Sequence, residues 1–230
     1  MKRTDGIRVR YCDLGAEGCA RASAVYEYLS DFAPLSVKEA AKTEGSCSLV
    51  RFSMGVYTDL FGGEELTLEA YTGGSGDGSV NRCARLYKSN GTVAAEINSV
   101  WLSADGAARK SALSADGDAA YISLDVPGRI NIPKDMRLSL VGERSVSHGD
   151  MDMSHTRRVS QYPDMLWDHV PQRDAKRILN LSLCFFGRCG KGETEKIYCG
   201  SIEEDIYYFR TVKKSGETVA EARLTVETVL

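Results

Sequence analysis

Apolar residues recur at regular intervals along two stretches of the chain, and the two stretches follow the same order. In the first stretch, apolar and basic residues alternate over 7–13, which predicts a strand. A helix is then predicted over 22–32, because Val25, Leu29 and Phe32 recur on one helical face. The first half of the chain therefore begins with a strand and a helix.

From residue 47 onward the hydrophobic period changes from that of a helix to two, the period of a half-buried strand. Segments 82–88 and 92–102 flank the dipeptide Asn90-Gly91, which is typical of a tight hairpin turn because both residues tolerate a left-handed backbone. The helix is thus followed by an antiparallel meander.

The second half repeats this plan. A predicted strand over 137–146 precedes an Asp-rich turn and a helix that carries Tyr162 and Trp167. Pro163 either kinks this helix or marks its first turn, since proline lacks the N–H that a helix interior needs. The strands predicted after the helix are 178–186, 194–200, 205–212 and 218–227.

The repeated order predicts two similar units, residues 1–124 and 125–230, with the turn-rich segment 104–135 as the linker. A long helix packed on an antiparallel sheet, present twice in tandem, is the pattern of a tandem double hotdog, an α+β fold. In that fold a slot lies between the helix of one unit and the sheet of the other, and it fits a long acyl chain.

Composition narrows the classes of function. The chain has 230 residues, 43% of them hydrophobic, and a formal charge of -3, which gives no basic face for nucleic acid. No apolar run approaches the roughly 18 to 20 residues of a membrane span. The basic N-terminus has no apolar stretch behind it, so we expect no signal peptide and a cytoplasmic protein.

The seven cysteines form an odd set without Cys-x-x-Cys pairs, which argues against a disulfide framework and against a zinc ribbon. A metal set of His148, Asp150, Asp152 and His155 fits no familiar zinc spacing. We therefore expect neither a metal nor a cofactor.

Several short motifs resemble one enzyme family in order and spacing. They are Val9-Arg10-Tyr11-Cys12-Asp13, Asn90-Gly91-Thr92-Val93-Ala94, Asp150-Met151-Asp152-Met153 followed by Tyr162, and Cys189-Gly190. Together they resemble the acyl-acyl carrier protein (acyl-ACP) thioesterases of plants and bacteria over nearly the whole chain. The resemblance implies release of free fatty acid from an acyl-ACP thioester in fatty-acid synthesis, with acyl-coenzyme A as the second substrate.

The chain departs from the family pattern at positions that carry the reaction. Aligned without gaps, the family's Asp falls on Asp152, its Asn on Ser154 and its His on Thr156. The paired asparagines fall on Arg158 and Val159, and the Glu before the cysteine falls on Arg188. A histidine is present one place early, at His155.

Thioester hydrolysis requires an activated water or nucleophile, donors to the carbonyl, and a proton for the departing thiol. By the resemblance, Asp152 would activate water or orient a partner, and Ser154 would donate a hydrogen bond. His155 would act as base if the turn shifts by one residue. Cys189 has a structural role or is a nucleophile whose pKa Arg188 would lower.

Two readings of the turn remain open. In one, Asp152 and His155 catalyse hydrolysis. In the other, Asp152 and Ser154 only cap the helix and His155 points to solvent, and the protein is a degenerate hotdog that binds acyl thioesters or a partner without hydrolysing them.

The implied partner is an acyl carrier protein that carries an acyl-phosphopantetheine. Lys38, Lys42, Arg157 and Arg158 would meet that acidic partner, or they belong to a solvated face. No nucleic acid and no membrane is expected as a partner, and a homodimer stays open.

Overall fold

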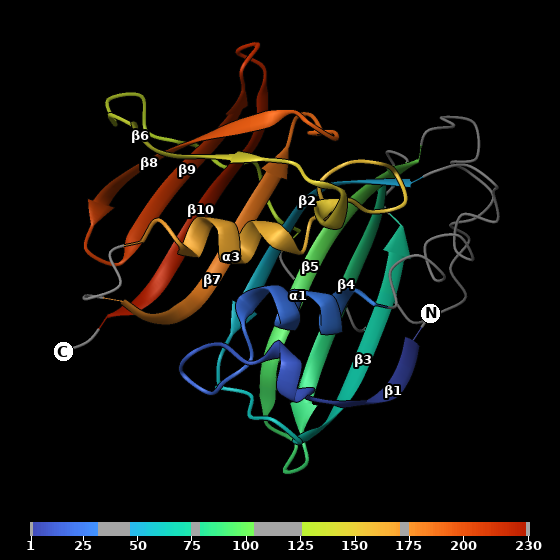
Figure 1. The fold of residues 1–230 in the computed structure, drawn as a ribbon. Helices are drawn as coiled ribbons and strands as arrows, with labels where there is room; N and C mark the ends of the chain where they lie inside the picture. Colours follow the sequence, from blue (N-terminus) through green and yellow to red (C-terminus); the bar gives the residue numbers. More distant parts are fainter. Residues whose placement is uncertain (1, 32–46, 75–78, 104–125, 171–174, 229–230) are drawn as a thin grey trace. The chain divides into compact units, whose positions relative to one another are not determined.

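The protein is described here by a computed structural model, which covers residues 2–31, 47–74, 79–103, 126–170 and 175–228. The chain divides into two compact units, residues 1–128 and 129–230 (Figure 1). The predicted boundary after residue 124 and most of the predicted linker lie outside the described residues, as do Lys38 and Lys42. Within the described part of the chain, no helix is long and apolar enough to cross a membrane.

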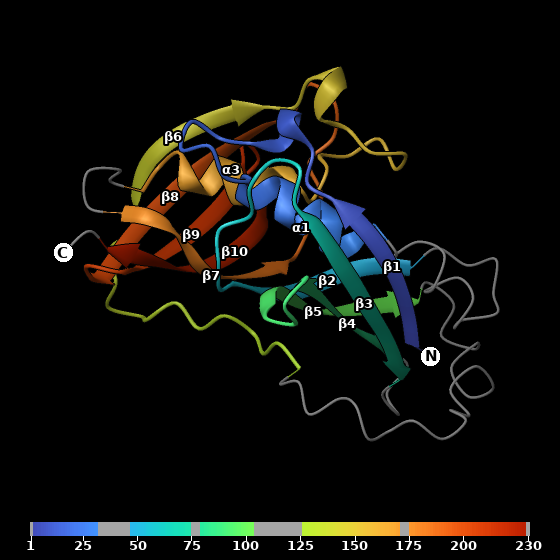
Figure 2. The same ribbon diagram turned by 90° about the horizontal axis from the view of Figure 1, so that it is seen from below.

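The first unit is an antiparallel sheet with a helix across one face. Its elements are β1 (Lys2–Arg8), α1 (Ala22–Ser30), β2 (Cys47–Val56), β3 (Glu65–Gly74), β4 (Ser79–Lys88) and β5 (Val93–Ser103). The strand order is β1-β3-β4-β5-β2. Helix α1 packs against β3, β4 and β5, as the two views of Figure 1 and Figure 2 show.

Alternation places the core of this unit under the helix. Leu66 and Leu68 of β3 are buried and the intervening Thr67 is exposed, as a period of two requires. Helix α1 buries Val25 and Leu29, the residues that the sequence placed on one face. The predicted hairpin is confirmed, because β4 pairs with β5 across a turn in which Gly91 has a φ of 80°.

The strand predicted over 7–13 is wrong beyond residue 8. The chain leaves the sheet at Arg8 and closes a 3-10 turn, η1 (Tyr11–Asp13), in which Tyr11 is 74% exposed. The reason is polar bonding in the turn: the Asp13 carboxylate accepts hydrogen bonds from Arg10 Nε at 2.6 Å and from the Tyr28 hydroxyl, 15 residues further along the chain, at 2.5 Å. These bonds favour a turn over continued strand pairing.

The second unit repeats the architecture. Its elements are β6 (Ser139–Ser145), η3 (His148–Asp150), α3 (Gln161–Trp167), β7 (Ala175–Phe185), β8 (Thr194–Glu203), β9 (Ile206–Lys213) and β10 (Thr218–Thr228). The strand order is β7-β10-β9-β8-β6, and every pairing between these neighbours is antiparallel. Helix α3 lies across β7 and β10 in Figure 1.

The helix of the second unit is shorter than the long helix that the sequence predicts. It begins at Gln161 and ends at Trp167, which places Pro163 in the first turn, where its missing N–H costs little. Tyr162 packs edge-on against Phe185 of β7, with ring centroids 5.2 Å apart. This contact fixes the start of α3 on the sheet.

Matching backbone hydrogen bonds show that the two units repeat in detail. Gly15 N donates to Cys19 O at 2.8 Å, and Asp152 N donates to Thr156 O at 2.9 Å. Further matched donor and acceptor pairs are Gly18–Gly15 with His155–Asp152, Ala20–Leu60 with Arg157–Cys189, Arg21–Asp13 with Arg158–Asp150, and Lys88–Thr92 with Lys213–Glu217. The N-terminal turn of one unit can therefore be compared with that of the other, residue by residue.

Candidate functional site

Three of the four sequence-predicted site residues, Asp152, Ser154 and His155, fall on a tight turn that joins η3 to the segment before α3. Asp152 Oδ1 accepts hydrogen bonds from Ser154 N at 2.8 Å and from Ser154 Oγ at 2.5 Å. Ser154 Oγ also lies 2.9 Å from Thr156 Oγ1. The structure therefore brings Asp152, Ser154 and Thr156 together, and these are the positions on which the family's Asp, Asn and His fall.

The geometry leaves part of this cluster available for chemistry. Among the described residues, Asp152 Oδ2 has no hydrogen-bond donor, whereas Oδ1 is held by Ser154. A carboxylate fixed through one oxygen can orient a water molecule with the other. The turn is thus a polar, partly exposed element rather than a closed core.

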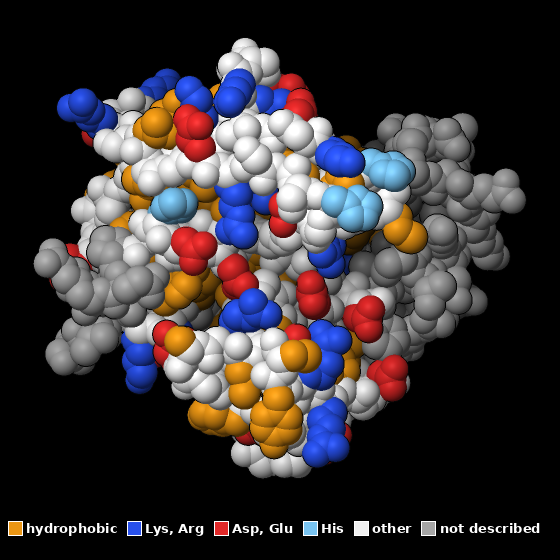
Figure 3. All heavy atoms as spheres, in the orientation of Figure 1, with side chains coloured by type: hydrophobic (Ala, Val, Ile, Leu, Met, Phe, Trp, Pro, Cys, Tyr) orange, Lys and Arg blue, Asp and Glu red, His pale blue; other side chains and the backbone are white. Residues whose placement is uncertain are grey.

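His155 occupies the left-handed position of the turn. Its φ is 59°, and the equivalent residue of the first unit is Gly18, with a φ of 78°. A non-glycine residue in this region is strained by contact between Cβ and the following carbonyl. The imidazole is exposed and makes no hydrogen bond within the described part of the chain, and no hydrogen bond joins it to Asp152. Figure 3 shows histidine side chains at the surface.

Cys189 precedes the Thr156–Gly190 bridge of the same turn but is buried, with 1% of its surface exposed. Burial raises the pKa of the Cys189 thiol to about 12, and the charges of Glu195 and Glu193 add to the effect. The thiol is therefore protonated near neutral pH. Arg188, which the sequence offered as an activator, stacks its guanidinium 5.1 Å from the centre of the Phe185 ring.

Asp150 is the last residue of η3, the 3-10 helix that precedes the turn. Its carboxylate accepts hydrogen bonds from Ser147 N at 2.7 Å, from Ser147 Oγ at 2.6 Å and from Gln161 Nε2 at 2.9 Å. The Ser147 hydroxyl bond is the main reason that the pKa of Asp150 is lowered to about 2. Asp150 therefore caps η3 and links it to α3.

Asp150 predicts a specific loss of stability in acid. Because its pKa in the folded protein lies below the ordinary value of 3.8, its ionised form stabilises the fold above about pH 4, and this contribution disappears between about pH 4 and pH 2. We expect Asp150→Asn to lower the free energy of unfolding near pH 7 by up to about 2 kcal/mol and to flatten its decline in that window. Urea unfolding of both proteins at several pH values checks this, and parallel pH curves would contradict it.

Sequence reasoning missed a buried network behind the turn. Arg157 Nε lies 3.0 Å from Glu195 Oε1, and both side chains are fully buried. The Tyr162 hydroxyl donates to Glu195 Oε1 at 3.1 Å, and burial raises the pKa of Tyr162 well above its ordinary value. Arg157 also donates to Gln161 Oε1 at 3.3 Å and to the carbonyl of Arg144 at 3.1 Å. The interpretation of Arg157 as part of a solvated face is therefore wrong.

One signal in the sequence does indicate this network. In β8, the alternation that places Ile197 inside the unit also places Glu195 inside, two residues earlier. A carboxylate at an inward position requires a charged or hydrogen-bonded partner, since an isolated buried charge is costly. The partner, Arg157, is 38 residues away in sequence and follows only from the fold.

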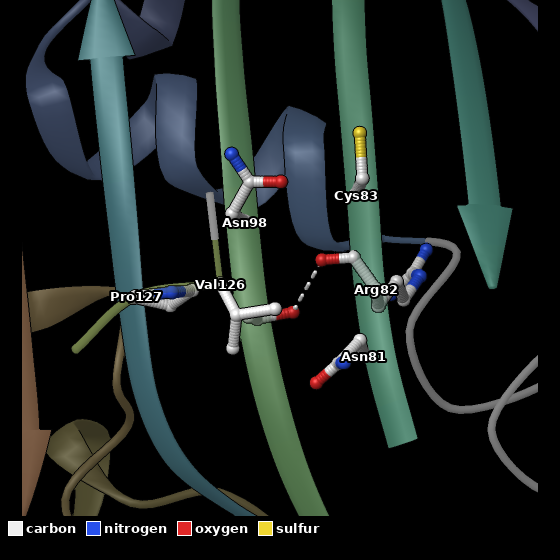
Figure 4. Close-up of a pocket in the computed structure, with 7 residues that line it drawn as sticks. Asn81, Arg82, Cys83, Asn98, Val126 and Pro127 are labelled. Carbon is white, nitrogen blue, oxygen red and sulfur yellow. Dashed lines mark hydrogen bonds between the residues drawn. The ribbon is translucent and has the colours of Figure 1, made fainter. Parts of the chain in front are cut away.

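Two other features, a possible metal site and a small pocket, offer less support for a functional site. Among the described residues, no group of three or more His, Cys, Asp or Glu side chains is arranged to hold a metal ion. A small pocket of the first unit, drawn in Figure 4, is lined by Asn81, Arg82, Cys83, Asn98, Ser99, Val126 and Pro127. Burial raises the pKa of Cys83 to about 11, so its thiol is a weak nucleophile near neutral pH. None of the sequence-predicted site residues lines this pocket.

Comparison with known proteins finds matches among solved structures. No family model and no curated protein matches the chain. An acyl-ACP thioesterase from Bacteroides thetaiotaomicron has a TM-score of 0.77 at 16% identity, covering 98% of each chain. The 12:0-ACP thioesterase from Umbellularia californica has a TM-score of 0.74 at 13% identity, covering 99% of this chain and 98% of that one.

A protein with a different chemistry is similar as well. A MaoC-like dehydratase from Phytophthora capsici has a TM-score of 0.72 at 14% identity, covering 99% of this chain and 95% of that one. The fold is therefore hotdog-like and similar to that of bacterial and plant acyl-ACP thioesterases, as the sequence resemblance indicated. Because a dehydratase is similar too, the fold does not select the reaction, and the side chains of the site must.

Proposed function

We propose that the protein is a thioester hydrolase that releases free fatty acid from acyl-ACP conjugates, with acyl-coenzyme A as the second substrate class. The carrying observation is the cluster of Asp152, Ser154 and Thr156, which lies where the sequence resemblance assigns catalysis. The likeness of fold to acyl-ACP thioesterases over 98% of the chain supports it. A tandem double hotdog, a role in fatty-acid synthesis and a cytoplasmic location belong to the same proposal.

Each candidate residue has a role in this proposal. Asp152 orients the attacking water through Oδ2 while the N–H and hydroxyl of Ser154 hold Oδ1. The Thr156 hydroxyl, which lies 2.9 Å from Ser154 Oγ, turns to donate toward the developing oxyanion. His155 supplies or accepts the proton, because its imidazole is exposed at the tip of the turn and a neutral imidazole can both donate and accept a hydrogen bond. Cys189 has a structural role beside the turn and no catalytic one, since its protonated thiol is a poor nucleophile.

The partner in this proposal is an acyl carrier protein, whose phosphopantetheine arm brings the thioester. Arg158 is exposed and lies next to the turn in sequence, where it also donates to the carbonyl of Gly149. A guanidinium suits a phosphate because it offers paired donors and keeps its charge at every physiological pH. Arg158 is thus the described residue that we assign to the phosphate of the arm.

A hydrolysis assay tests the proposal. Purified protein is incubated with acyl-ACP and acyl-coenzyme A conjugates of several chain lengths, and the free thiol is followed with a chromogenic disulfide. We expect turnover for at least one acyl-ACP, and faster turnover than for the matching coenzyme A ester. Absence of free thiol above the buffer rate for every conjugate would contradict the proposal.

A second candidate function is binding of acyl thioesters without hydrolysis. The observation that favours it is the exposed imidazole of His155, which no hydrogen bond joins to Asp152. A base without an orienting partner is a weak catalyst. Saturable binding of an acyl-ACP, measured by calorimetry, together with no release of thiol from the same conjugate, would select this candidate.

A further inference from the structure

Arg157 and Glu195 form a buried ion pair in the second unit. The first unit has no ion pair at the positions that the repeat makes equivalent to these two. Glu64 Oε2 accepts from Phe61 N at 3.1 Å, and Glu193 Oε2 accepts from Gly190 N at 2.6 Å, so β3 and β8 begin at matched positions. Two residues further on, the first unit has Leu66 and the second has Glu195. The pairing partners match too, because Leu66 faces Ile7 and Glu195 faces Arg144.

The other members of the network also have apolar counterparts. Ala20 and Arg157 both donate their backbone N–H to a matched carbonyl, that of Leu60 in one unit and of Cys189 in the other, at 2.8 Å. Val25 corresponds to Tyr162 when the helix ends, Asp31 and Asp168, are aligned. The four matched pairs are Ala20 with Arg157, Val25 with Tyr162, Leu60 with Cys189, and Leu66 with Glu195.

This comparison shows that the architecture does not require the charges. In the first unit Val25, Leu60 and Leu66 are at most 3% exposed and fill the same positions with hydrocarbon. Removing two charges from water costs free energy that their attraction repays only in part, so apolar replacement of a buried ion pair is often neutral or stabilising. A pair kept at that cost needs another reason than stability.

The connections of the network indicate the reason. Besides Glu195, the Arg157 guanidinium bonds to Gln161 Oε1, and Gln161 Nε2 bonds to the Asp150 carboxylate. Asp150 and Arg157 flank the turn of residues 152–156 on its two sides. One continuous chain of charged and amide groups therefore holds both ends of the turn on which the candidate site lies.

We propose that Arg157 and Glu195 are positioning residues for this turn, fixing it against β8 so that Asp152 and Ser154 keep their arrangement. The inference rests on the function proposed above only for its catalytic readout. Positioning needs buried, fully bonded groups of fixed geometry, and the planar guanidinium with three separate acceptors supplies that. The first unit, with Gly15 and Gly18 in its turn, has the apolar Ala20, Val25 and Leu66 in place of Arg157, Tyr162 and Glu195. Asp13, the match of Asp150, bonds instead to Arg10 and Tyr28.

The test replaces the charged and hydroxyl side chains of the network by apolar ones, as at the matched positions of the first unit. The triple variant Arg157→Ala, Tyr162→Phe, Glu195→Leu removes every charged or hydroxyl group of the set together, so no charge is left buried without a partner. We expect it to fold, with cooperative urea unfolding and an unchanged circular dichroism spectrum. Amide hydrogen exchange at Asp152 and His155 should become at least about tenfold faster, because their turn bonds lose their anchor.

The same variant provides an internal control and a kinetic readout. Exchange at Gly15 and Gly18, the matched donors of the first unit, should stay unchanged. For the best thioester, kcat should fall about 10- to 100-fold while KM changes less than about twofold, the split expected when groups are misplaced but substrate still binds. Arg157→Lys, which keeps the charge but cannot reach three acceptors at once, should show the same split to a smaller extent.

The outcomes separate this inference from the proposed function. If the wild-type protein hydrolyses no thioester, the proposed function fails, and hydrogen exchange alone still decides the inference. Unchanged exchange at Asp152 and His155 in the folded triple variant would overturn the inference. A triple variant that does not fold would overturn it as well, because the network would then serve stability.

Discussion

Asp152→Asn should lower kcat for the best acyl thioester at least about 100-fold, the range expected for loss of a general acid or base. The substitution removes the charge that orients and polarises the water. It keeps the Oδ1 acceptor to which Ser154 N and Oγ donate, so the turn should keep its shape. The free energy of unfolding should therefore change by less than about 1 kcal/mol, and kinetics together with urea unfolding check both parts.

A matched control separates the loss of a catalytic group from the loss of one negative charge. Asp168→Asn makes the same change on an exposed residue of the same unit, whose ion pair with Arg144 spans 3.7 Å. Exposed pairs of this kind contribute little, so turnover and stability should both stay near the wild-type values. If Asp152→Asn hydrolyses as fast as Asp168→Asn, the reaction takes place elsewhere.

The same assay tests the other candidate residues, His155 and Cys189. His155→Gly keeps the left-handed backbone that Gly18 adopts in the first unit, so a loss of activity reports the imidazole and not the turn. We expect a loss at least about as large as the roughly 100-fold of a general base. Cys189→Ala should have a smaller effect, because the pKa of about 12 keeps that thiol protonated. Normal turnover of His155→Gly would assign proton transfer to another group.

The sequence predicts the local elements of this fold well, because each depends on residues close together in the chain. Asn90-Gly91 specifies the β4–β5 hairpin, and the strands after α3 follow from alternation with ends shifted by at most a few residues. The failure at η1 has the opposite origin. Asp13 bonds to Tyr28, which lies 15 residues away, and this contact ends the strand that alternation alone continues to Tyr11.

The candidate site divides in the same way. Asp152, Ser154 and Thr156 lie within five residues, and their cluster follows from a short turn that any local motif can encode. The network behind them joins Arg157 to a glutamate on another strand, and no local pattern specifies which buried cation meets which buried anion. The repeat itself was visible in the sequence. The matched hydrogen bonds were needed to show which positions are apolar in the first unit and charged in the second.

Arg157→Ala alone should lower the free energy of unfolding by about 3–5 kcal/mol, since it leaves the fully buried Glu195 without its cation. Glu195→Leu alone should cost a similar amount, because a guanidinium cannot release its proton to escape the buried site. Urea unfolding of both variants measures these losses. For comparison, Lys196→Ala, which breaks an exposed pair with Glu143, should cost less than about 1 kcal/mol.

The decisive quantity is the interaction between the two substitutions. Because the first unit folds with Ala20 and Leu66 at the matched positions, the double variant Arg157→Ala, Glu195→Leu should be more stable than either single variant. Such a result means that each charge is needed chiefly because the other is present, and that the pair as a whole contributes little net stability. Costs that simply add would instead mean that each side chain packs independently. The network would then be an ordinary part of the core, without a separate role in holding the turn.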